Sequence, residues 1–493
     1  AFALESTASV ADGWIDDRRA EARFSLVTRA RVPAGRERDA PPFSSSSCAP
    51  AAQTPHENAR SECHRGGHRP LGAKAAWRAA GDPTCCGVVS ADPTSLQVPA
   101  DLLPADGRFC SGPSKVRSEQ VDAVVAAGER LRGTSHRKTP VKNLVGGVRS
   151  KLPELFSLPD GWEIVLGNGG STVFWDVATF GLVTEQSHHA VFGEFSSKFA
   201  TASAAAPHLG DPTTVESEVG DHPDVVAVDG ADLYALTHNE TSTGVAMQLR
   251  RPEGIGDAIV AVDATSAAGG LRWDPTEVDV YYFAPQKCFA SEGGLWLAAC
   301  SPAGVERIES LSASGRWCPA ALDLGTALDN SRKDQTYNTP SITTFVMLDA
   351  QLDWMLSNGG LEFAAGRSDQ SATTLYGWAE ARDWASPFVA DPAKRSSVVG
   401  TIDLDESISA DEVCAVLRAN GVLDTDAYRK LGRNQLRIGM FPAIDPADVE
   451  ALTATVDHIV GALTCPDTRC QTPSVRRSEC LTPPDRARRG RCW

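Results

Sequence analysis

Short apolar runs alternate with stretches of helical periodicity through the middle of the chain. The runs are rich in β-branched and aromatic residues and are bounded by Gly or Pro, so they predict buried strands. We expect strands at residues 163–166, 190–192, 225–228, 233–237, 259–262, 280–283 and 295–298, and helices at 119–132 and 141–155. This alternation predicts an α/β fold, with a mostly parallel sheet between two layers of helices. A ligand is then expected at the carboxyl ends of the strands.

A second group of elements follows Pro340. Helices are expected at residues 342–356, 363–384, 411–420 and 445–463, and strands at 398–404 and 436–440. We interpret the chain as a large domain at 115–350 followed by a smaller C-terminal α/β domain at 351–464. Residues 93–114 are expected to form an N-terminal segment that packs on the small domain.

The two ends of the chain differ from its body in composition. Residues 1–92 and 465–493 are rich in Arg, Pro, Ser and Cys, and apolar periodicity is weak there. Such segments bury too little surface to offset chain entropy, so disorder is expected in both. Their composition resembles that of GC-rich codons read out of frame, which suggests that both flanks are non-native. The alternative is a basic tail that binds a nucleic-acid partner.

The body of the protein is acidic. Residues 91–464 hold 28 Lys and Arg against 50 Asp and Glu. So acidic a body disfavours non-specific binding of nucleic acid. A small anionic substrate must therefore bind in a local basic pocket. The sequence has no apolar run long enough for a membrane helix and no secretory pattern at its start, so we expect a cytoplasmic protein. The 13 cysteines match no metal-ligand spacing, so no metal is expected.

Three polar features follow the predicted strands in order. A glycine-rich turn with the sequence GNGGST spans residues 167–172, Asp263 ends the run IVAV, and Lys287 follows VYYFAPQ. A strand, a glycine turn and a helix start offer free N–H groups to a phosphate. A carboxylate and an amine at neighbouring strand ends complete what pyridoxal phosphate needs, namely a partner for the ring nitrogen and a nucleophile. Taken singly, each feature has an ordinary alternative: a loop turn, a helix cap and a surface lysine.

Seven short motifs together carry a family resemblance. They are Ser111-Gly112-Pro113, Gly133-Thr134-Ser135-His136-Arg137, Asn239-Glu240-Thr241-Ser242-Thr243-Gly244, Asp263-Ala264-Thr265-Ser266, Ala284-Pro285-Gln286-Lys287, Tyr337-Asn338-Thr339-Pro340 and Leu436-Arg437. In these motifs the chain resembles the phosphoserine aminotransferases of actinobacterial type, which are class-V, fold-type I pyridoxal-phosphate enzymes. The resemblance extends from about residue 93 to 463 and implies the fold-type I architecture.

The resemblance also implies roles for the cofactor-binding residues. Lys287 would form the covalent bond to the cofactor and move the proton, while Asp263 would pair with the pyridinium nitrogen. Further cofactor contacts are expected from Gly170, Ser171, Thr172, Phe195, Thr241, Gln286, Asn338 and Thr339. Phe195 stands where the family often has a stacking Trp, and a core Phe is the alternative reading. Thr172 stands where many members have Arg, so one anion contact must be made differently.

The substrate contacts implied by the resemblance are basic. Arg437 would bind the α-carboxylate, and His136 with Arg137 would bind the substrate phosphate, with a solvated turn as the alternative for this pair. Arg429 and Lys430 align more loosely with a second basic pair. The loop with Asn338 and Thr339 matches one that reaches the cofactor phosphate of a neighbouring subunit, which implies a homodimer with shared active sites. An ordinary Asn-Thr-Pro turn is the alternative there.

The implied activity is amino transfer from glutamate to 3-phosphohydroxypyruvate, giving O-phosphoserine and 2-oxoglutarate. The related 4-phosphohydroxythreonine reaction of vitamin B6 synthesis stays open. One alternative is another fold-type I enzyme, such as a serine or alanine–glyoxylate aminotransferase. A cysteine desulfurase fits less well, because that family usually has His where Gln286 stands. An idle cofactor-binding module, serving as a regulator or scaffold, is the alternative outside catalysis.

Overall fold

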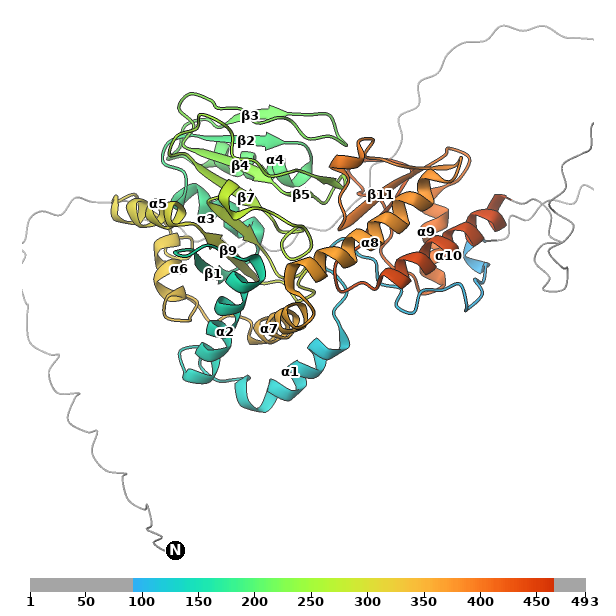
Figure 1. Cartoon of the computed structure of the whole chain (residues 1–493), viewed down its shortest axis with the longest axis horizontal. Coiled ribbons are helices and arrows are strands. Elements are labelled where there is room, and N and C mark those ends of the chain that lie inside the picture. Colours follow the sequence, from blue (N-terminus) through green and yellow to red (C-terminus); the bar gives the residue numbers. More distant parts are fainter. Residues whose placement is uncertain (1–91, 465–493) are drawn as a thin grey trace, which may run out of the picture. The chain divides into compact units, whose positions relative to one another are not determined.

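A computed structural model describes residues 92–464 of the 493-residue chain (Figure 1). The predictions for the two flanks, apart from Asp92, lie outside the described residues. The small elements near the start and in the loops are η1 (Pro93–Ser95), η2 (Pro275–Glu277), η3 (Pro392–Lys394), β5 (Asn239–Glu240) and β6 (Val245–Ala246). In the described part of the chain, no helix combines the length and apolar character that crossing a membrane requires.

A seven-stranded sheet forms the centre of the large domain, in the order β1-β9-β8-β7-β4-β2-β3. Its strands are β1 (Glu163–Asn168), β2 (Ser187–Val191), β3 (Thr213–Glu216), β4 (Leu233–Thr237), β7 (Ile259–Asp263), β8 (Val280–Phe283) and β9 (Leu295–Cys300). Only β9 runs antiparallel to its neighbours in this sheet. The prediction of a mostly parallel sheet is therefore confirmed.

Helices cover both faces of this sheet. Their bounds are α1 (Ser118–Leu131), α2 (Thr139–Phe156), α3 (Ser171–Gly181), α4 (Glu194–Ala205), α5 (Pro302–Ala313), α6 (Leu324–Ser331) and α7 (Ile342–Ser357). Alternate residues of β8 belong to opposite cores, as the two-residue repeat of a strand requires. Tyr281 and Phe283 pack with α2 and α7, whereas Val280 and Tyr282 pack with helices α3 to α6.

The second group of elements has its own core. It contains β10 (Ala385–Pro387), β11 (Val399–Leu404) and β12 (Gln435–Gly439), which form an antiparallel sheet, and α8 (Gly360–Glu380), α9 (Ala410–Ala419) and α10 (Pro446–Thr464). Val98 and Phe109 of the N-terminal segment are part of this core. The change from one core to the other falls within α8, because Ala364 packs with the large domain and Ala372 with the small one.

One predicted strand is wrong. Residues 225–228 form no strand, and the sheet instead ends at β3, a stretch that the apolar pattern did not mark. Val226 is 65% exposed, and the N–H of Val228 donates to the hydroxyl of Tyr234 (2.7 Å) rather than to a neighbouring strand. The position beside β2 is taken by β3 instead of by this apolar run.

Candidate active site

Lys287 follows β8 and has a buried side chain. Its ammonium nitrogen donates to the carbonyl oxygen of Ser111, at 2.7 Å. The chain passes so close at Gly112 that a Cβ placed there would lie 2.0 Å from Nζ of Lys287. Burial, followed by the charge of the nearby Arg437, lowers the pKa of Lys287 to about 8. An amine in this position is available as a nucleophile near neutral pH.

The amine of Lys287 should therefore react at a lower pH than an ordinary lysine. We expect the rate at which apoenzyme captures pyridoxal phosphate to rise with pH and to level off above about 8, because only the neutral amine attacks an aldehyde. Stopped-flow absorbance across the pH range measures this profile. A midpoint near the ordinary lysine value of 10.5 would show that the buried setting does not tune the amine.

Asp263 is the last residue of β7, the strand that pairs with β8. One carboxylate oxygen accepts bonds from the N–H and the hydroxyl of Thr265 (3.0 and 2.6 Å), and the other accepts from the indole N–H of Trp175 (3.1 Å). Burial raises the pKa of Asp263, and these hydrogen bonds oppose the rise. A cationic ring nitrogen beside the carboxylate would favour its charged form. Trp175 was not predicted, and its place one turn into the helix after the glycine turn was the available signal.

The glycine-rich turn opens helix α3 without a side-chain cap. Gly169 has φ of +119°, a conformation that favours glycine, and the helix begins at Ser171 after Gly170. The hydroxyl of Ser171 lies 2.5 Å from that of Thr265, which links the turn to Asp263. Thr172, the next residue, is exposed. The uncapped N–H groups of this helix start could bind a phosphate.

Gln286 directly precedes Lys287, after the end of β8. Its backbone carbonyl accepts from the N–H of Ser114 (2.7 Å), and its side-chain oxygen is buried without a hydrogen-bond partner among the described residues. A buried acceptor without a partner is costly, so a bound donor group is expected to satisfy it. The NH2 group of the same amide, rather than this oxygen, could donate to a phosphate.

Thr241 and Phe195 were predicted to contact the ring. Thr241 is buried, and its hydroxyl donates to the hydroxyl of Ser266 (2.9 Å). Phe195 is half-buried at the start of α4, with its ring centroid 6.3 Å from that of Tyr428 and 4.9 Å from the Lys198 ammonium. Both residues follow strands of the large sheet, and their contacts to a ring stay predictions.

Arg437 lies in β12 of the small domain. One terminal nitrogen donates to the carbonyl of Thr241 (3.3 Å), and Nε is buried without a partner among the described residues. The guanidinium carbon lies 5.2 Å from the ring centroid of Tyr428, and burial lowers the pKa of Arg437. A guanidinium with an unused N–H can bind a carboxylate. Tyr428 was not predicted, because its contact with Arg437 depends on how the loop before β12 folds.

Arg429 and Lys430, the basic pair that aligns more loosely with the family, lie on the surface, and Lys430 has another partner. Lys430 and Arg429 are exposed, and Lys430 forms an ion pair with Glu194 at the start of α4. Glu194 also pairs with Lys198, at 3.4 Å. A substrate phosphate bound by Lys430 would have to displace Glu194.

The structure brings the other predicted anion-binding residues together in a second cluster. Nδ1 of His136 lies 3.1 Å from the hydroxyl of Thr339, and Arg137 donates to the side chain of Gln335 (2.7 Å) and the carbonyl of Tyr337 (3.3 Å). Asn338 and Thr339 are exposed. Burial, followed by the charge of Arg137, lowers the pKa of His136.

This second cluster is separate from the lysine within one chain. The carbonyl of Thr339 accepts from the side-chain amide of Asn168 at the end of β1 (3.1 Å). No hydrogen bond or ion pair joins His136, Arg137 or Thr339 to Lys287 in residues 92–464. The chain thus places one anion-binding cluster beside the lysine and another beyond the glycine turn.

Comparison with known proteins places this geometry in a family. The sequence matches the aminotransferase class-V family over residues 123–425. It is 60% identical over 371 residues to the phosphoserine aminotransferase of a Nocardioides species, which covers 75% of this chain and 99% of that protein. The chain belongs to the phosphoserine aminotransferase family. The family member of Corynebacterium glutamicum is 59% identical over 363 residues, covering 74% of this chain and 96% of its own.

Solved structures show that this phosphoserine aminotransferase family member has the same fold. The crystal structure of the phosphoserine aminotransferase from Cytophaga hutchinsonii matches with a TM-score of 0.66 at 23% identity, and covers 72% of this chain and 99% of that one. The enzyme from Bacillus circulans subsp. alkalophilus matches with a TM-score of 0.63 at 20% identity, covering 73% and 99%. The fold-type I architecture that the motifs implied is confirmed.

Proposed function

We propose that this protein transfers the amino group of glutamate to 3-phosphohydroxypyruvate, giving O-phosphoserine and 2-oxoglutarate, with pyridoxal phosphate as cofactor. The single observation that carries the proposal is the pairing of a buried amine, Lys287, with a buried carboxylate, Asp263, at the ends of adjacent strands. The named relatives with about 60% identity support it.

The residues present fit the cofactor. The uncapped start of α3 after Gly170 would hold the phosphate, together with the side-chain NH2 group of Gln286. Asp263 would lie opposite the ring nitrogen and keep it protonated. When bound, the cofactor supplies an electron sink for the carbanion that forms at the substrate Cα. The part of Lys287 is to bind the cofactor and then, as a neutral amine, to take and return the proton at Cα.

Binding of the substrate anions falls to the arginines. The unused N–H groups of Arg437 are available for the α-carboxylate beside Lys287. His136 and Arg137 are proposed to bind the substrate phosphate, and Asn338 and Thr339 to contact the cofactor phosphate. Because this second cluster has no bond to Lys287 within its own chain, we propose that it completes the site of a second copy in a homodimer.

Exposed apolar residues support the proposed homodimer, and free cysteines support a cytoplasmic location. Val121 and Val125 on α1 are 52% and 68% exposed, and Tyr337 next to Asn338 is 41% exposed, so large apolar side chains are available on the surface for a partner. The described cysteines, such as the buried Cys288 and Cys300, are free thiols. Free thiols fit a reducing compartment, and we propose the cytoplasm.

Replacing Arg137 with Ala tests the substrate assignment. Each charge-assisted contact to a buried phosphate contributes about 1.5–3 kcal/mol, so phosphohydroxypyruvate should be used about tenfold less well or worse. The glutamate half-reaction brings no phosphate and should change far less. The measurement is each half-reaction in single turnover. Arg437→Ala is the comparison, since both substrates carry the α-carboxylate and both half-reactions should suffer.

The outcomes separate the alternatives. Equal loss in both half-reactions for Arg137→Ala would make that residue structural, and the phosphate site would have to lie at Arg429 and Lys430. Equal use of phosphorylated and unphosphorylated hydroxypyruvate by the wild-type protein would favour another class-V activity. A protein that binds the cofactor but gives no absorbance change with glutamate would be an idle binding module.

A further inference from the structure

The N-terminal residues 106–117, here called the strap, connect the small domain to the lysine. Its first part pairs with the small domain: the carbonyl of Gly107 accepts from Leu423 N (2.7 Å), and the carbonyl of Phe109 accepts from Gly439 N (2.7 Å). Beyond the strap, the side chain of Gln120 donates to the carbonyls of Phe289 (3.3 Å) and Met347 (3.0 Å) in the large domain. The strap therefore bridges the two cores.

The middle of the strap touches Lys287 and little else. The carbonyl of Ser111 accepts from Nζ of Lys287 (2.7 Å), and Gly112 leaves no room for a Cβ beside that side chain. The hydroxyl of Ser111 is buried without a partner among the described residues. The next backbone hydrogen bond is at Ser114, whose N–H donates to the carbonyl of Gln286. The position of the Ser111 carbonyl is thus set mainly by how the two ends of this bridge are held.

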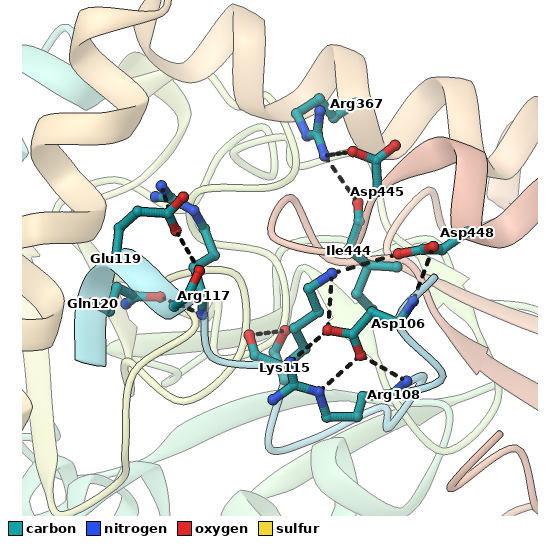
Figure 2. Close-up of polar contacts among 12 residues, drawn as sticks. Asp106, Arg108, Lys115, Arg117, Glu119, Gln120, Arg367, Ile444, Asp445 and Asp448 are labelled. Carbon is teal, nitrogen blue, oxygen red and sulfur yellow. Dashed lines mark hydrogen bonds and ion pairs between the residues drawn. The ribbon is translucent and has the colours of Figure 1, made fainter. Parts of the chain in front are cut away.

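An ion cluster holds the second end of the strap, at Lys115 (Figure 2). The ammonium of Lys115 lies 3.4 Å from a carboxylate oxygen of Asp106 and 3.5 Å from one of Asp448, in the first turn of α10. Asp448 also accepts from the N–H of Asp106 (3.2 Å). Arg108 donates to Asp106 through two nitrogens (2.8 and 2.5 Å). This interaction is the main reason that the pKa of Asp106 is lowered to about 2. The cluster has two cations and two anions.

Three of the four side chains of this cluster are largely shielded from solvent. The exposed fractions are 13% for Lys115, 7% for Asp448 and 24% for Asp106, whereas Arg108 is 49% exposed. Loss of one partner from such a group leaves a shielded charge without compensation, so the geometry around it must change. Because Lys115 ties both ends of the strap, at Asp106 and at its own position, to α10, the segment between them would move with it.

We propose that Lys115 is a positioning residue for Lys287. Its ion pairs to Asp106 and Asp448 fold the strap so that the Ser111 carbonyl meets the amine of Lys287. The small domain, through α10, thereby sets the place of the amine that the proposed reaction uses. This inference rests on the proposed role of Lys287.

The experiment compares Lys115→Met, Lys115→Arg and Asp448→Asn in the full-length protein. In Lys115→Met we expect turnover per cofactor-loaded site at saturating substrates to fall about tenfold or more, because a displaced catalytic group loses rate steeply. The KM values should change little. Lys115→Arg keeps both ion pairs and should restore turnover. Asp448→Asn removes only one pair and should lie between, which provides a milder variant where Lys115→Met fails to fold.

The pH profile for cofactor capture by the apoenzyme separates position from charge. A simple charge effect would move the midpoint up when the cation of Lys115 is removed and down when the anion of Asp448 is removed. Loss of the Ser111 acceptor destabilises the ammonium of Lys287 in both variants, so we expect both midpoints to fall. Opposite shifts, or a midpoint that does not move in either variant, would overturn the proposal.

Lys151→Met is the matched control. Lys151 also lies between two carboxylates, Asp349 (2.7 Å) and Asp353 (2.6 Å), but these ion pairs join α2 to α7 rather than the strap to α10. The Lys151→Met substitution should lower the melting temperature without changing turnover per cofactor-loaded site. If Lys115→Met behaves like Lys151→Met, its role is only structural. In that case the wild-type protein would still be an active aminotransferase, and only the proposal for Lys115 would be wrong. If the proposed function itself were wrong, the wild-type protein would lack the activity, or Lys287→Ala would retain it.

Discussion

Replacing Lys287 with Ala is expected to abolish covalent attachment of the cofactor and to lower turnover by about 10³-fold or more. The side chain is buried at the end of β8, next to the strand that ends at Asp263. In the proposed mechanism Lys287 is both the amine that binds the aldehyde and the base that handles the proton at Cα, so a single substitution removes both contributions. Visible absorbance, mass spectrometry after borohydride reduction and single-turnover rates measure the loss.

A lysine outside this site provides the control for this experiment. Lys394 forms an ion pair with Asp221 on the surface, and Lys394→Ala should keep both the colour and the rate. The assignment would be wrong if borohydride fixed the cofactor in Lys287→Ala to another lysine and turnover persisted. Noncovalent binding of the cofactor in Lys287→Ala would not contradict it, since the phosphate cradle and Asp263 remain.

The positions at strand ends could be predicted because their signal is local. Asp263 and Lys287 each follow a short apolar run, and parallel neighbouring strands bring their carboxyl ends to one edge of a sheet. The glycine turn before α3 is local as well, since its φ of +119° at Gly169 favours glycine. The period of the apolar pattern and a few turn residues are enough to predict these features.

The partners of these groups could not be predicted in the same way. The bond from Trp175 to Asp263 joins residues 88 positions apart, and the bond from Lys287 to Ser111 joins residues 176 apart. Such contacts depend on how whole layers pack. The apolar run at 225–228 shows the same limit, because an apolar pattern forms a strand only where packing brings it beside a partner, and here β3 takes the position beside β2.

Asp263→Ala should leave the cofactor bound through Lys287 but slow proton removal by about a hundredfold or more, about 2.7 kcal/mol. The carboxylate lies in a fully packed setting where Thr265 and Trp175 hold both of its oxygens. Burial raises the pKa of Asp263, so the charged form depends on a cation opposite to it. Without the carboxylate the ring nitrogen loses its proton near neutral pH, and an unprotonated ring stabilises a carbanion poorly.

The informative measurement is the glutamate half-reaction in single turnover with glutamate deuterated at Cα. A larger isotope effect in Asp263→Ala would show that proton removal has become rate-limiting, which loss of packing alone would not cause. Asp279→Ala is the matched control, because Asp279 is also buried but accepts from Arg251 (2.6 Å) and Val260 N (2.9 Å) at the start of β8. That variant should lose stability while its cofactor-loaded sites keep their rate. Wild-type rates in Asp263→Ala would reduce Asp263 to a helix cap, and another group would have to hold the ring nitrogen.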